Sequence, residues 1–579
     1  MLPVHCGDIA IHSNIDLELQ TETAGKCVTV CAHWNKNDEP KPVLELRWAL
    51  PLVDIQYEWY PSCGKDRSLR VDWSEGVKSK ISSSAPVYCF YNAAGRNRFT
   101  LALSDVLTET DCALGVREED GTLLCVVKIP LDATGATDSY RVTLYRDYDD
   151  VSFAEVLRRV SAWWEQDCGY RPMSVPDAAK LPMYSCWYSF HQATIAHEIE
   201  AECARAKALG MDTVIVDDGW QTDDGNRGYG FCGDWQVTPN KIPDMKAHVQ
   251  TVHDLGMKYM LWYSVPFVGE WAGCWERFKD KLLAHDLRMH AGVLDPRWPD
   301  VRAYLIDTYV KALKEWNLDG FKLDFIDSFR PDHLLTFEEG MDYASVEDAV
   351  LRLMTDVMDA LKAIKPEILI EFRQSYIGPA MRTFGNMFRV GDCPADPLSN
   401  RVGVLDLRLL SGSTAVHSDM LMWHKDDTVE AAARQILSII FGVAQISVKL
   451  DVIPEEHRRM VAFWLKFMAD NRALLQDAPI EVEAPQDLYP LAMTRKGEEA
   501  AIAVYSTGHA ANIPADCEKI FLMNATAETE IPLKFAQGCA YDVETLNCLG
   551  EKTGSFMLEA NSFSLIDVPV SGMAVLTKK

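Results

Sequence analysis

Charged side chains recur at the ends of short apolar runs in the middle of this sequence. The run that begins at residue 212 ends in Asp217 and Asp218, and the run from residue 320 carries Lys322 and Asp324. Asp327 belongs to the end of that same run, and later runs carry Glu371, Arg373, Arg389, Asp392, His417 and Asp419. An isolated Asp after a strand is often a helix N-cap. Because a carboxylate among apolar residues loses hydration unless it is paired or functional, acids at five strand ends of one unit indicate a shared site.

This set of side chains suits the recognition and cleavage of a sugar. Carboxylates and arginines bind hydroxyl groups, and Trp187, Trp220 and Trp262 offer flat faces to a pyranose ring. Glycosidic cleavage uses two carboxyl groups, one as an acid and one as a nucleophile or base. A metal centre is not expected, because His191, His417 and His424 lack the close spacing of a ligand pair. No other cofactor is expected.

Eight β-runs must position these groups. They span residues 183–190, 212–218, 258–265, 320–326, 367–373, 386–392, 414–419 and 444–450. Apolar residues at three- and four-residue steps, such as Ile195, Ile199 and Cys203, predict helices between them. This alternation predicts a (β/α)8 barrel over residues 183–478, whose catalytic groups lie at the carboxyl ends of the strands. No early strand is followed by GxGxxG or GxxxxGK[ST], so a nucleotide-binding fold is not supported.

β-rich segments flank the barrel on both sides. Residues 1–165 contain short strands separated by turns and predict an N-terminal β-sandwich, which ends in a helix over about Ser152–Trp164. Residues 166–182 are predicted to be a linker, and residues 479–579 a C-terminal β-sandwich. The fold class is therefore multidomain, with a central barrel between two β-sandwich domains.

Composition restricts the partners. The 579 residues include 57 Lys and Arg against 85 Asp and Glu, a net charge of −28, which disfavours nucleic acids and anionic lipid. No apolar run is long enough to span a membrane, and the start lacks a basic segment before an apolar one, so we expect a cytoplasmic protein. The 16 cysteines form no CxxC pair, as expected for reduced thiols. The expected partner is a small oligosaccharide or glycoside, and a homo-oligomer stays open.

The motifs resemble those of the glycoside hydrolase family 36 α-galactosidases, which are related to the family 27 melibiases. Asp217-Asp218-Gly219-Trp220 is similar to the family's DDGW, whose acids bind hydroxyls of the terminal galactose. Lys322-Leu323-Asp324 resembles its K-x-D, in which the Lys contacts the sugar and the Asp is the nucleophile. Arg389-Val390-Gly391-Asp392 resembles the segment that carries the acid/base. The resemblance implies a retaining, exo-acting α-galactosidase with a covalent Asp intermediate.

Two departures from the family leave alternatives open. The sequence VGDCPAD replaces a longer WxSDxTD pattern, so Asp396 is a rival to Asp392 as acid/base. The segment from Glu371 to Tyr376 replaces a Cys- and Gly-rich loop near the C2 substituent of the sugar, so the favoured sugar stays undetermined. The alternatives are an α-N-acetylgalactosaminidase, another α-glycosidase or a transglycosylase on this scaffold, and a non-catalytic carbohydrate-binding protein.

Three physical expectations follow from these assignments. The charge of Lys322 favours the ionised form of Asp324, as a nucleophile requires. Burial beside other acids raises the pKa of Asp392, as a proton donor requires. Asp217 and Asp218 point to opposite faces of a strand, so both reach one sugar only if the strand ends between them, and Trp220 is expected to wall the pocket.

Overall fold

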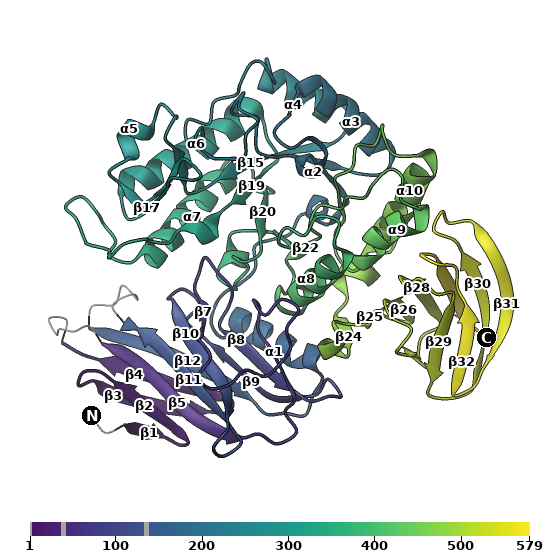
Figure 1. Ribbon diagram of the computed structural model, residues 1–579, viewed down its shortest axis with the longest axis horizontal. Helices are drawn as coiled ribbons and strands as arrows, with labels where there is room; N and C mark the ends of the chain where they lie inside the picture. The colour runs from purple at the N-terminus through teal and green to yellow at the C-terminus, as the bar shows by residue number, and fades with distance from the viewer. Residues whose placement is uncertain (1–2, 36–41, 132–137) are drawn as a thin grey trace.

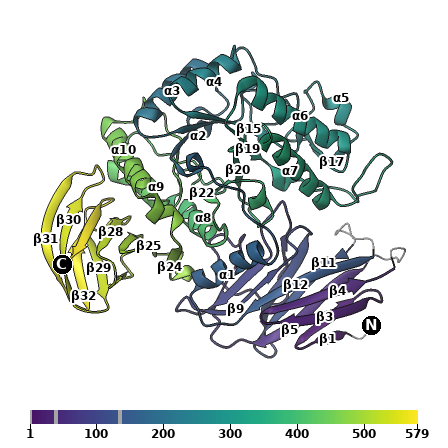
Figure 2. The same cartoon turned by 180° about the vertical axis from the view of Figure 1, so that it is seen from behind.

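The computed structural model describes residues 3–35, 42–131 and 138–579, so the first two residues of the start lie outside it. A β-rich unit, a mixed α/β unit and a second β-rich unit follow one another along the chain (Figure 1). The two β-rich units lie on separate sides of the central one, as the reverse view also shows (Figure 2). Among the described residues, no helix combines the length and the apolar character that crossing a membrane requires.

The N-terminal unit is a sandwich of two antiparallel six-stranded sheets, in the orders β1-β2-β5-β11-β10-β7 and β3-β4-β12-β9-β8-β6. Apolar side chains such as Leu46, Phe90 and Val127 are fully buried in its core. The strands are β1 (Val4–Cys6), β2 (Ile9–Ser13), β3 (Glu18–Ala24), β4 (Cys27–His33), β5 (Val43–Pro51), β6 (Tyr57–Trp59), β7 (Val77–Ser79), β8 (Val87–Tyr91), β9 (Asn97–Leu103), β10 (Thr110–Arg117), β11 (Thr122–Pro130) and β12 (Ser139–Asp147). The helix expected after them is α1 (Phe153–Gln166), which Ser152 caps by accepting a hydrogen bond from the Glu155 amide.

The central unit is a nearly closed barrel of eight parallel strands, in the order β22-β21-β20-β19-β15-β14-β13-β23. A parallel bridge between His417 and Val443 brings its two ends together. The strands are β13 (Met183–Ser185), β14 (Thr213–Val216), β15 (Lys258–Ser264), β19 (Gly320–Asp324), β20 (Leu369–Arg373), β21 (Met387–Arg389), β22 (Ala415–His417) and β23 (Gln445–Ile446). Each lies within one of the eight predicted runs, so the predicted barrel is confirmed.

Helices surround the barrel, and their apolar faces follow the predicted periodicity. In α3, for example, Ile199 and Cys203 are fully buried. The helices are α2 (Trp187–Phe190), α3 (Ala196–Ala208), α4 (Met245–Asp254), α5 (Trp275–Phe278), α6 (Pro299–Trp316), α7 (Val346–Lys362), α8 (Pro397–Leu410), α9 (Val429–Ser438) and α10 (Glu455–Asp470). Short 3₁₀-helices lie at Asp177–Lys180, Ile326–Ser328, Met381–Thr383 and Pro485–Asp487, and a short π-helix lies at Ala473–Asp477.

Three details of the barrel differ from the prediction. The run 183–190 is a strand only to Ser185 and then forms α2, because a short buried apolar run has no period that separates strand from helix. Between β20 and β21 the connection holds the 3₁₀ turn Met381–Thr383 and no α-helix in this fully described stretch. After β15 the chain forms an unpredicted antiparallel insertion of β16 (Phe267–Gly269), β17 (Leu282–Asp286) and β18 (Ala291–Leu294).

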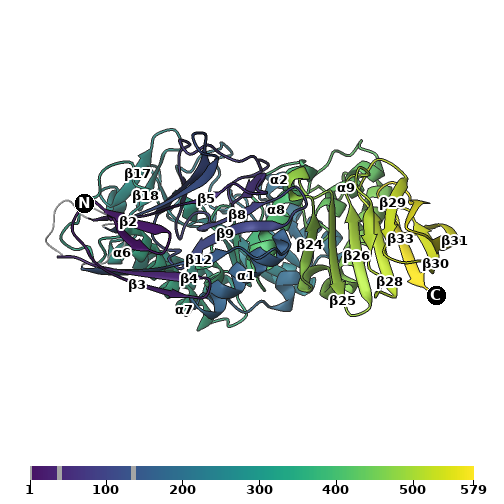
Figure 3. The same cartoon turned by 90° about the horizontal axis from the view of Figure 1, so that it is seen from below.

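The C-terminal unit packs a seven-stranded sheet, β24-β25-β26-β28-β33-β30-β31, against the three-stranded sheet β27-β29-β32. Figure 3 shows this unit at the end of the molecule opposite the N-terminus. The strands are β24 (Ile480–Glu483), β25 (Leu491–Lys496), β26 (Glu499–Val504), β27 (Ala511–Ile513), β28 (Lys519–Asn524), β29 (Glu530–Phe535), β30 (Cys539–Leu546), β31 (Lys552–Ala560), β32 (Phe563–Asp567) and β33 (Met573–Lys578). The three-part fold class is therefore confirmed, while the exact domain borders stay a prediction.

Candidate active site

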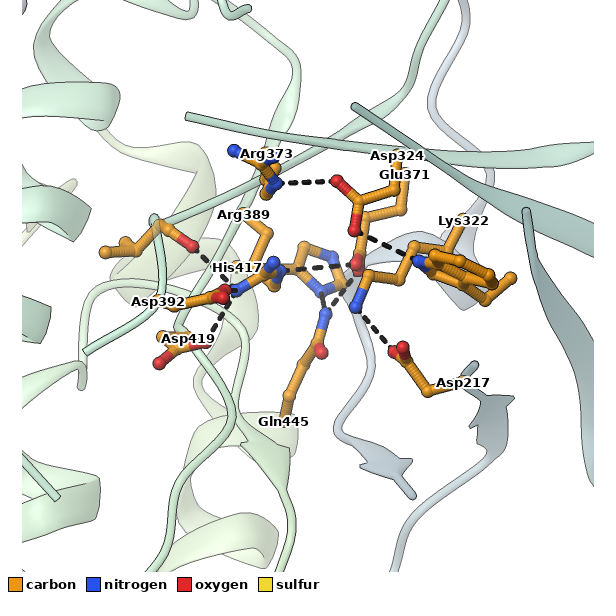
Figure 4. A network of polar contacts seen from close by, with 12 residues as sticks. Asp217, Lys322, Asp324, Glu371, Arg373, Arg389, Asp392, His417, Asp419 and Gln445 are labelled. Atoms are coloured by element: carbon orange, nitrogen blue, oxygen red, sulfur yellow. Dashed lines mark hydrogen bonds and ion pairs between the residues drawn. The ribbon is translucent and has the colours of Figure 1, made fainter. Parts of the chain in front are cut away.

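A cavity of about 870 Å³ lies at the carboxyl ends of the barrel strands, where barrel folds carry their sites. Two of the acids predicted from the sequence, Asp218 and Asp392, contribute to its wall. Its full lining is Trp187, Tyr188, His191, Gln192, Asp218, Arg227, Gly228, Tyr229, Arg288, Met289, Asp392, Pro394 and Met422. Beneath this cavity the predicted charged residues meet in one network (Figure 4). We call this set of side chains the barrel network: Asp217, Lys322, Asp324, Glu371, Arg373, Arg389, Asp392, His417, Asp419 and Gln445.

The acid pair lies just beyond the last residue of β14, so both carboxylates escape the strand alternation and turn toward the site. Asp217 Oδ2 accepts a bond from Lys322 Nζ at 2.5 Å. Asp218 accepts bonds from the amides of Gln192 and Gln221, both at 2.7 Å. Burial raises the pKa of Asp218 to about 6, although those two amide bonds oppose the shift. Asp218 therefore faces the cavity as an acceptor that loses its charge in mildly acidic solution.

Gly219 is required by the backbone next to this pair. Its φ is +109°, and a Cβ atom at this position would lie 2.5 Å from the Cα of Gln192. A side chain would therefore push away the loop that holds Asp218 through Gln192.

Asp324 is the last residue of β19 and is held by four donors. Its Oδ1 accepts bonds from Arg373 Nε at 2.6 Å, from the Phe325 amide at 2.8 Å and from the Tyr376 hydroxyl at 3.2 Å. Its Oδ2 accepts a bond from Trp262 Nε1 at 3.0 Å. Burial acts to raise the pKa of Asp324, but the charges of Arg373, Lys322 and Arg389 outweigh it and hold the pKa well below its ordinary value. The ionised form expected of this residue is thus favoured.

The cation in direct contact with Asp324 is Arg373, and not Lys322 as we expected from the sequence. Lys322 bonds Asp217 instead, and the remaining guanidinium donors of Arg373 reach the Gln374 carbonyl and Asp327. The guanidinium group of Arg373 is thus engaged by contacts within the protein, and its predicted contact with the sugar stays a prediction. The parallel register explains the pairing, because β19 and β20 are adjacent strands and both end at this level.

Asp392 follows β21 and exposes 59% of its side chain. Arg389 Nη1 donates to Asp392 Oδ1 at 3.0 Å and to Asp419 Oδ1 at 2.5 Å. Because β21 ends at Arg389, the three-residue offset does not separate the two side chains as it would on a continuing strand. Burial acts to raise the pKa of Asp392, but the charge of Arg389 prevails and lowers it. The expected upward shift of the Asp392 pKa is therefore wrong, because the nearest charge is a cation.

Arg389 and Glu371 were predicted to contact the sugar, but both side chains are 99% buried beneath the cavity. Glu371 bonds Gln445 Nε2, and its Oε1 lies 3.6 Å from Arg389 Nε. His417 accepts from Gln445 at Nδ1 and donates from Nε2 to the Ala179 carbonyl, and burial lowers its pKa to about 4. These residues support the site from below and do not line it.

The three tryptophans have different positions. Trp187 lines the cavity and packs against His191, with ring centroids 4.5 Å apart. Trp262 is buried and presents its N–H to Asp324. Trp220 is completely buried, donates to the Trp262 carbonyl and stacks on Trp235. Trp220 therefore does not wall the pocket, because its ring fills the core behind the acid pair.

Asp396, the rival acid, is the N-cap of α8. It accepts bonds from the Ser399 amide at 3.0 Å and from the Ser399 hydroxyl, and it pairs with Lys65 on the surface. The presence of a second Asp close to Asp392 in the sequence is thus explained by the need for a helix cap at this position. Among the described residues, no three His, Cys, Asp or Glu side chains lie close enough to hold a metal ion.

Several lining residues were not predicted from the sequence. Tyr188 and Gln192 follow the first strand, Arg227 and Tyr229 lie in the loop after β14, and Arg288 and Met289 lie between β17 and β18. The Gly-rich, polar segment around Tyr229 is the one available signal, since loops after barrel strands carry function. The insertion that carries Arg288 has no periodic pattern in the sequence.

Comparison with known proteins relates both the sequence and the fold to one group of enzymes. Residues 184–382 match a family model described as Melibiase. The bifunctional α-galactosidase/sucrose kinase AgaSK of Mediterraneibacter gnavus is 27% identical over 175 residues, which are 29% of this chain and 17% of that protein. α-Galactosidase AgaA of Geobacillus stearothermophilus is 30% identical over 127 residues, 21% of this chain and 17% of that protein. The matched segments thus span about a sixth of these curated relatives.

The solved structures match over a much larger part of the chain. The GH36 α-galactosidase AgaA of G. stearothermophilus in complex with raffinose has a TM-score of 0.65 at 15% identity, covering 99% of this chain and 81% of that one. An α-galactosidase from Lactobacillus brevis has a TM-score of 0.64 at 14% identity, covering 100% and 83%. The chain therefore shares the fold of these GH36 α-galactosidases, and residues 184–382 resemble the Melibiase family in sequence.

Proposed function

We propose that this GH36 α-galactosidase-like protein is a retaining, exo-acting glycoside hydrolase that releases terminal α-galactosyl residues. The observation that carries the proposal is the pair of carboxylates with opposite environments at the ends of β19 and β21, the two strands on either side of β20. Asp324 is buried and ionised among four donors, whereas Asp392 is exposed at the cavity wall. Relatives named as α-galactosidases support the same activity.

In this proposal Asp324 is the nucleophile. Trp262, Tyr376 and Arg373 fix its carboxylate and keep it charged, so that one oxygen can attack C1 of the bound sugar without a prior proton transfer. Formation of the glycosyl–Asp324 ester breaks the glycosidic bond, and a proton passes to the leaving oxygen. Water then attacks C1 of the ester, so two inversions retain the α configuration.

Asp392 is assigned as the acid/base. Its exposure allows it to reach first the leaving oxygen and then the attacking water, whereas Asp396 is occupied as a helix cap. Arg389 favours the ionised form of Asp392, which is the form that activates water in the second step. Protonation for the first step therefore requires an acidic medium or a bound substrate that weakens the Arg389 contact.

The acid pair is assigned to sugar recognition. Asp218 faces the cavity, and its carboxylate accepts hydrogen bonds but does not donate them when it is ionised. An axial O4 with O6 beside it, which distinguishes galactose from glucose, offers donors that match such acceptors. Lys322 and Asp217 bind one another next to it and can exchange part of this bond for sugar hydroxyls.

The test is a hydrolysis screen with 4-nitrophenyl α-galactoside, its N-acetylgalactosaminide and glucoside counterparts, and raffinose. The proposal expects release from the α-galactoside, with α-galactose as the first anomer seen by NMR. β-Galactose as the first product would exclude the retaining mechanism. Release from the N-acetylgalactosaminide alone would move the assignment to that sugar, and binding without any release would favour a carbohydrate-binding protein. Transfer products at high sugar concentration would identify a transglycosylase.

A further inference from the structure

Two arginines stand at the mouth of the cavity, Arg227 in the loop after β14 and Arg288 between β17 and β18. Both side chains line the cavity and both residues are exposed. Because both are exposed we place them at its open end, whereas the proposed nucleophile Asp324 is only 7% exposed and lies in the network beneath the cavity.

No carboxylate neutralises this pair of charges within the described part of the chain. Neither guanidinium group has an ion pair or a side-chain hydrogen bond there, although the chain as a whole has a net charge of −28. The two acids that share the cavity are already engaged, since Asp218 bonds two amides and Asp392 pairs with Arg389. The mouth of the cavity is thus positive in a protein whose surface is predominantly negative.

The two arginine loops are held to each other. The Tyr229 amide donates to the Met289 carbonyl at 3.0 Å, and the Arg288 amide donates to Asp286 Oδ1 at 2.9 Å. The Tyr229 ring stacks near Trp262, the donor to Asp324, with centroids 6.3 Å apart. These backbone contacts therefore hold the two loops that carry the arginines in place relative to the reacting centre.

The charge of Arg227 acts on the cavity itself. Burial lowers the pKa of His191, and the Arg227 charge lowers it further. His191 lines the same cavity and packs against Trp187. The neighbouring imidazole is thus kept neutral, and it does not add a competing charge to the wall.

We propose that Arg227 and Arg288 bind an oxyanion on the leaving group, so that the preferred substrates are α-glycosides whose aglycone carries a carboxylate or a sulfate. This inference rests on the proposed function, because the hydrolytic site defines which end of the cavity holds the leaving group. In an exo-acting site the terminal sugar fills the closed end, so the aglycone meets the mouth. A guanidinium fork matches both oxyanions and forms charge-assisted bonds with them.

The test compares substrates that differ only in the charge of the aglycone. Melibiitol and melibionate share the galactosyl group and the leaving hydroxyl, and melibionate has a carboxylate where melibiitol has an alcohol. The 3-carbamoyl-, 3-carboxy- and 3-sulfophenyl α-galactosides form a second series that separates carboxylate from sulfonate, which represents sulfate. Galactose release gives kcat/KM for each substrate with wild-type protein, R227Q/R288Q and the control R171Q. Arg171 is exposed and does not line the cavity.

Wild-type protein should favour the anionic member of each pair about 10-fold or more, the range of a charge-assisted hydrogen bond. In R227Q/R288Q this ratio should fall to about 1, and in R171Q it should not change. R227K/R288K, which keeps the charge but not the fork, should give an intermediate ratio. A gain for the carboxylates alone assigns acidic sugars or acids as leaving groups, and a gain for the sulfonate alone assigns sulfated ones.

A ratio near 1 in wild-type protein, or one that R227Q/R288Q leaves unchanged, overturns the inference while the proposed hydrolysis stands. If no galactose is released from any of the five compounds, the proposed function fails. In that case, calorimetry that compares the binding of melibionate with that of melibiitol tests the role of the two arginines independently of hydrolysis. Tighter binding of melibionate that is lost in R227Q/R288Q supports an oxyanion site, and equal binding excludes it.

Discussion

Two of the buried groups of Asp and Arg side chains in the described part of the chain can be compared, and of these two only one faces a cavity. The first is the barrel network. The second, which we call the joint network, consists of Trp59, Arg67, Asp406 and Tyr489. Asp406 in α8 accepts bonds from Trp59 Nε1 at 3.0 Å and from the Tyr489 hydroxyl, and it lies 3.5 Å from Arg67. These residues come from the N-terminal unit, the barrel and the C-terminal unit, so the network joins all three.

The two networks differ in whether they are open to the cavity and not in the kinds of charged residue that form them. In both networks a buried carboxylate is held by an arginine and by aromatic donors. Yet the joint network is closed, with Asp406 and Arg67 more than 90% buried and no member lining the cavity. The barrel network opens to the cavity through Asp392 and leaves Glu371 Oε1 and Arg389 Nε without hydrogen-bond partners beneath it. Buried ion pairs alone therefore do not identify a functional site. Substitutions in each network can test whether one serves turnover and the other serves stability.

Asp324→Ala should have the largest effect on turnover. Loss of the nucleophile removes the covalent step, so kcat should fall on the order of 10⁴-fold or more, while the protein stays folded because Arg373 keeps Asp327 as a partner. The measurement is hydrolysis of 4-nitrophenyl α-galactoside together with thermal unfolding. Added azide should give the galactosyl azide of inverted configuration. A variant that keeps a tenth of the wild-type rate would remove Asp324 from this role.

Asp392→Ala should have the next largest effect, and its size should depend on the leaving group. Loss of the acid should lower kcat on raffinose by about 10²–10⁴-fold, and much less on aryl galactosides whose phenols are acidic, because these leave without protonation. Asp396→Ala is the matched control, since it removes an acid four residues away that caps α8. If the leaving-group dependence appears in Asp396→Ala instead, the two roles must be exchanged.

Asp218→Asn should weaken recognition rather than chemistry. Loss of a charged acceptor should lower kcat/KM for α-galactosides by about 10–100-fold and narrow the gap to α-glucosides. Because the pKa of Asp218 is raised to about 6, its acceptor form exists above that pH and is lost as the pH falls below it. The wild-type kcat/KM should therefore decline below about pH 6, and the Asn variant should lack that decline. An unchanged ratio between the kcat/KM values for α-galactosides and α-glucosides would show that Asp218 does not recognise O4 of the sugar.

Asp406→Ala should affect stability and leave turnover unchanged. Removal of this carboxylate leaves Arg67 as an uncompensated buried charge, which costs about 3–5 kcal/mol of the free energy of unfolding. Denaturant unfolding measures the loss, and kcat per folded molecule should equal that of the wild type. Asp406→Asn, which keeps acceptors for Trp59 and Tyr489, should cost less. A fall in kcat with stability intact would contradict the distinction between the two networks.

Much of the site could be predicted because its acids follow recognisable strands. Asp217, Asp324 and Asp392 each lie at the end of a buried strand or within three residues of it, and parallel strands of a barrel end at one level. Side-chain pairing was not predictable in this way. Arg373 bonds Asp324 across 49 residues of sequence, and that contact depends on the register of adjoining strands. The residues at the mouth of the cavity were harder still to predict, because Arg227 and Arg288 lie on loops that have no apolar periodicity in the sequence.

The order of the three units, the eight strands and the clustering of acids at their ends could all be predicted from the amino-acid sequence. These features follow from local apolar periodicity and from the cost of leaving a carboxylate unpaired among apolar residues. Three features became known from the folded chain: Asp396 caps a helix, Trp220 is buried, and the charge beside Asp392 comes from Arg389. The reason is physical: exposure and the pKa of a carboxyl group depend on neighbours distant in sequence, which only the packed barrel brings together.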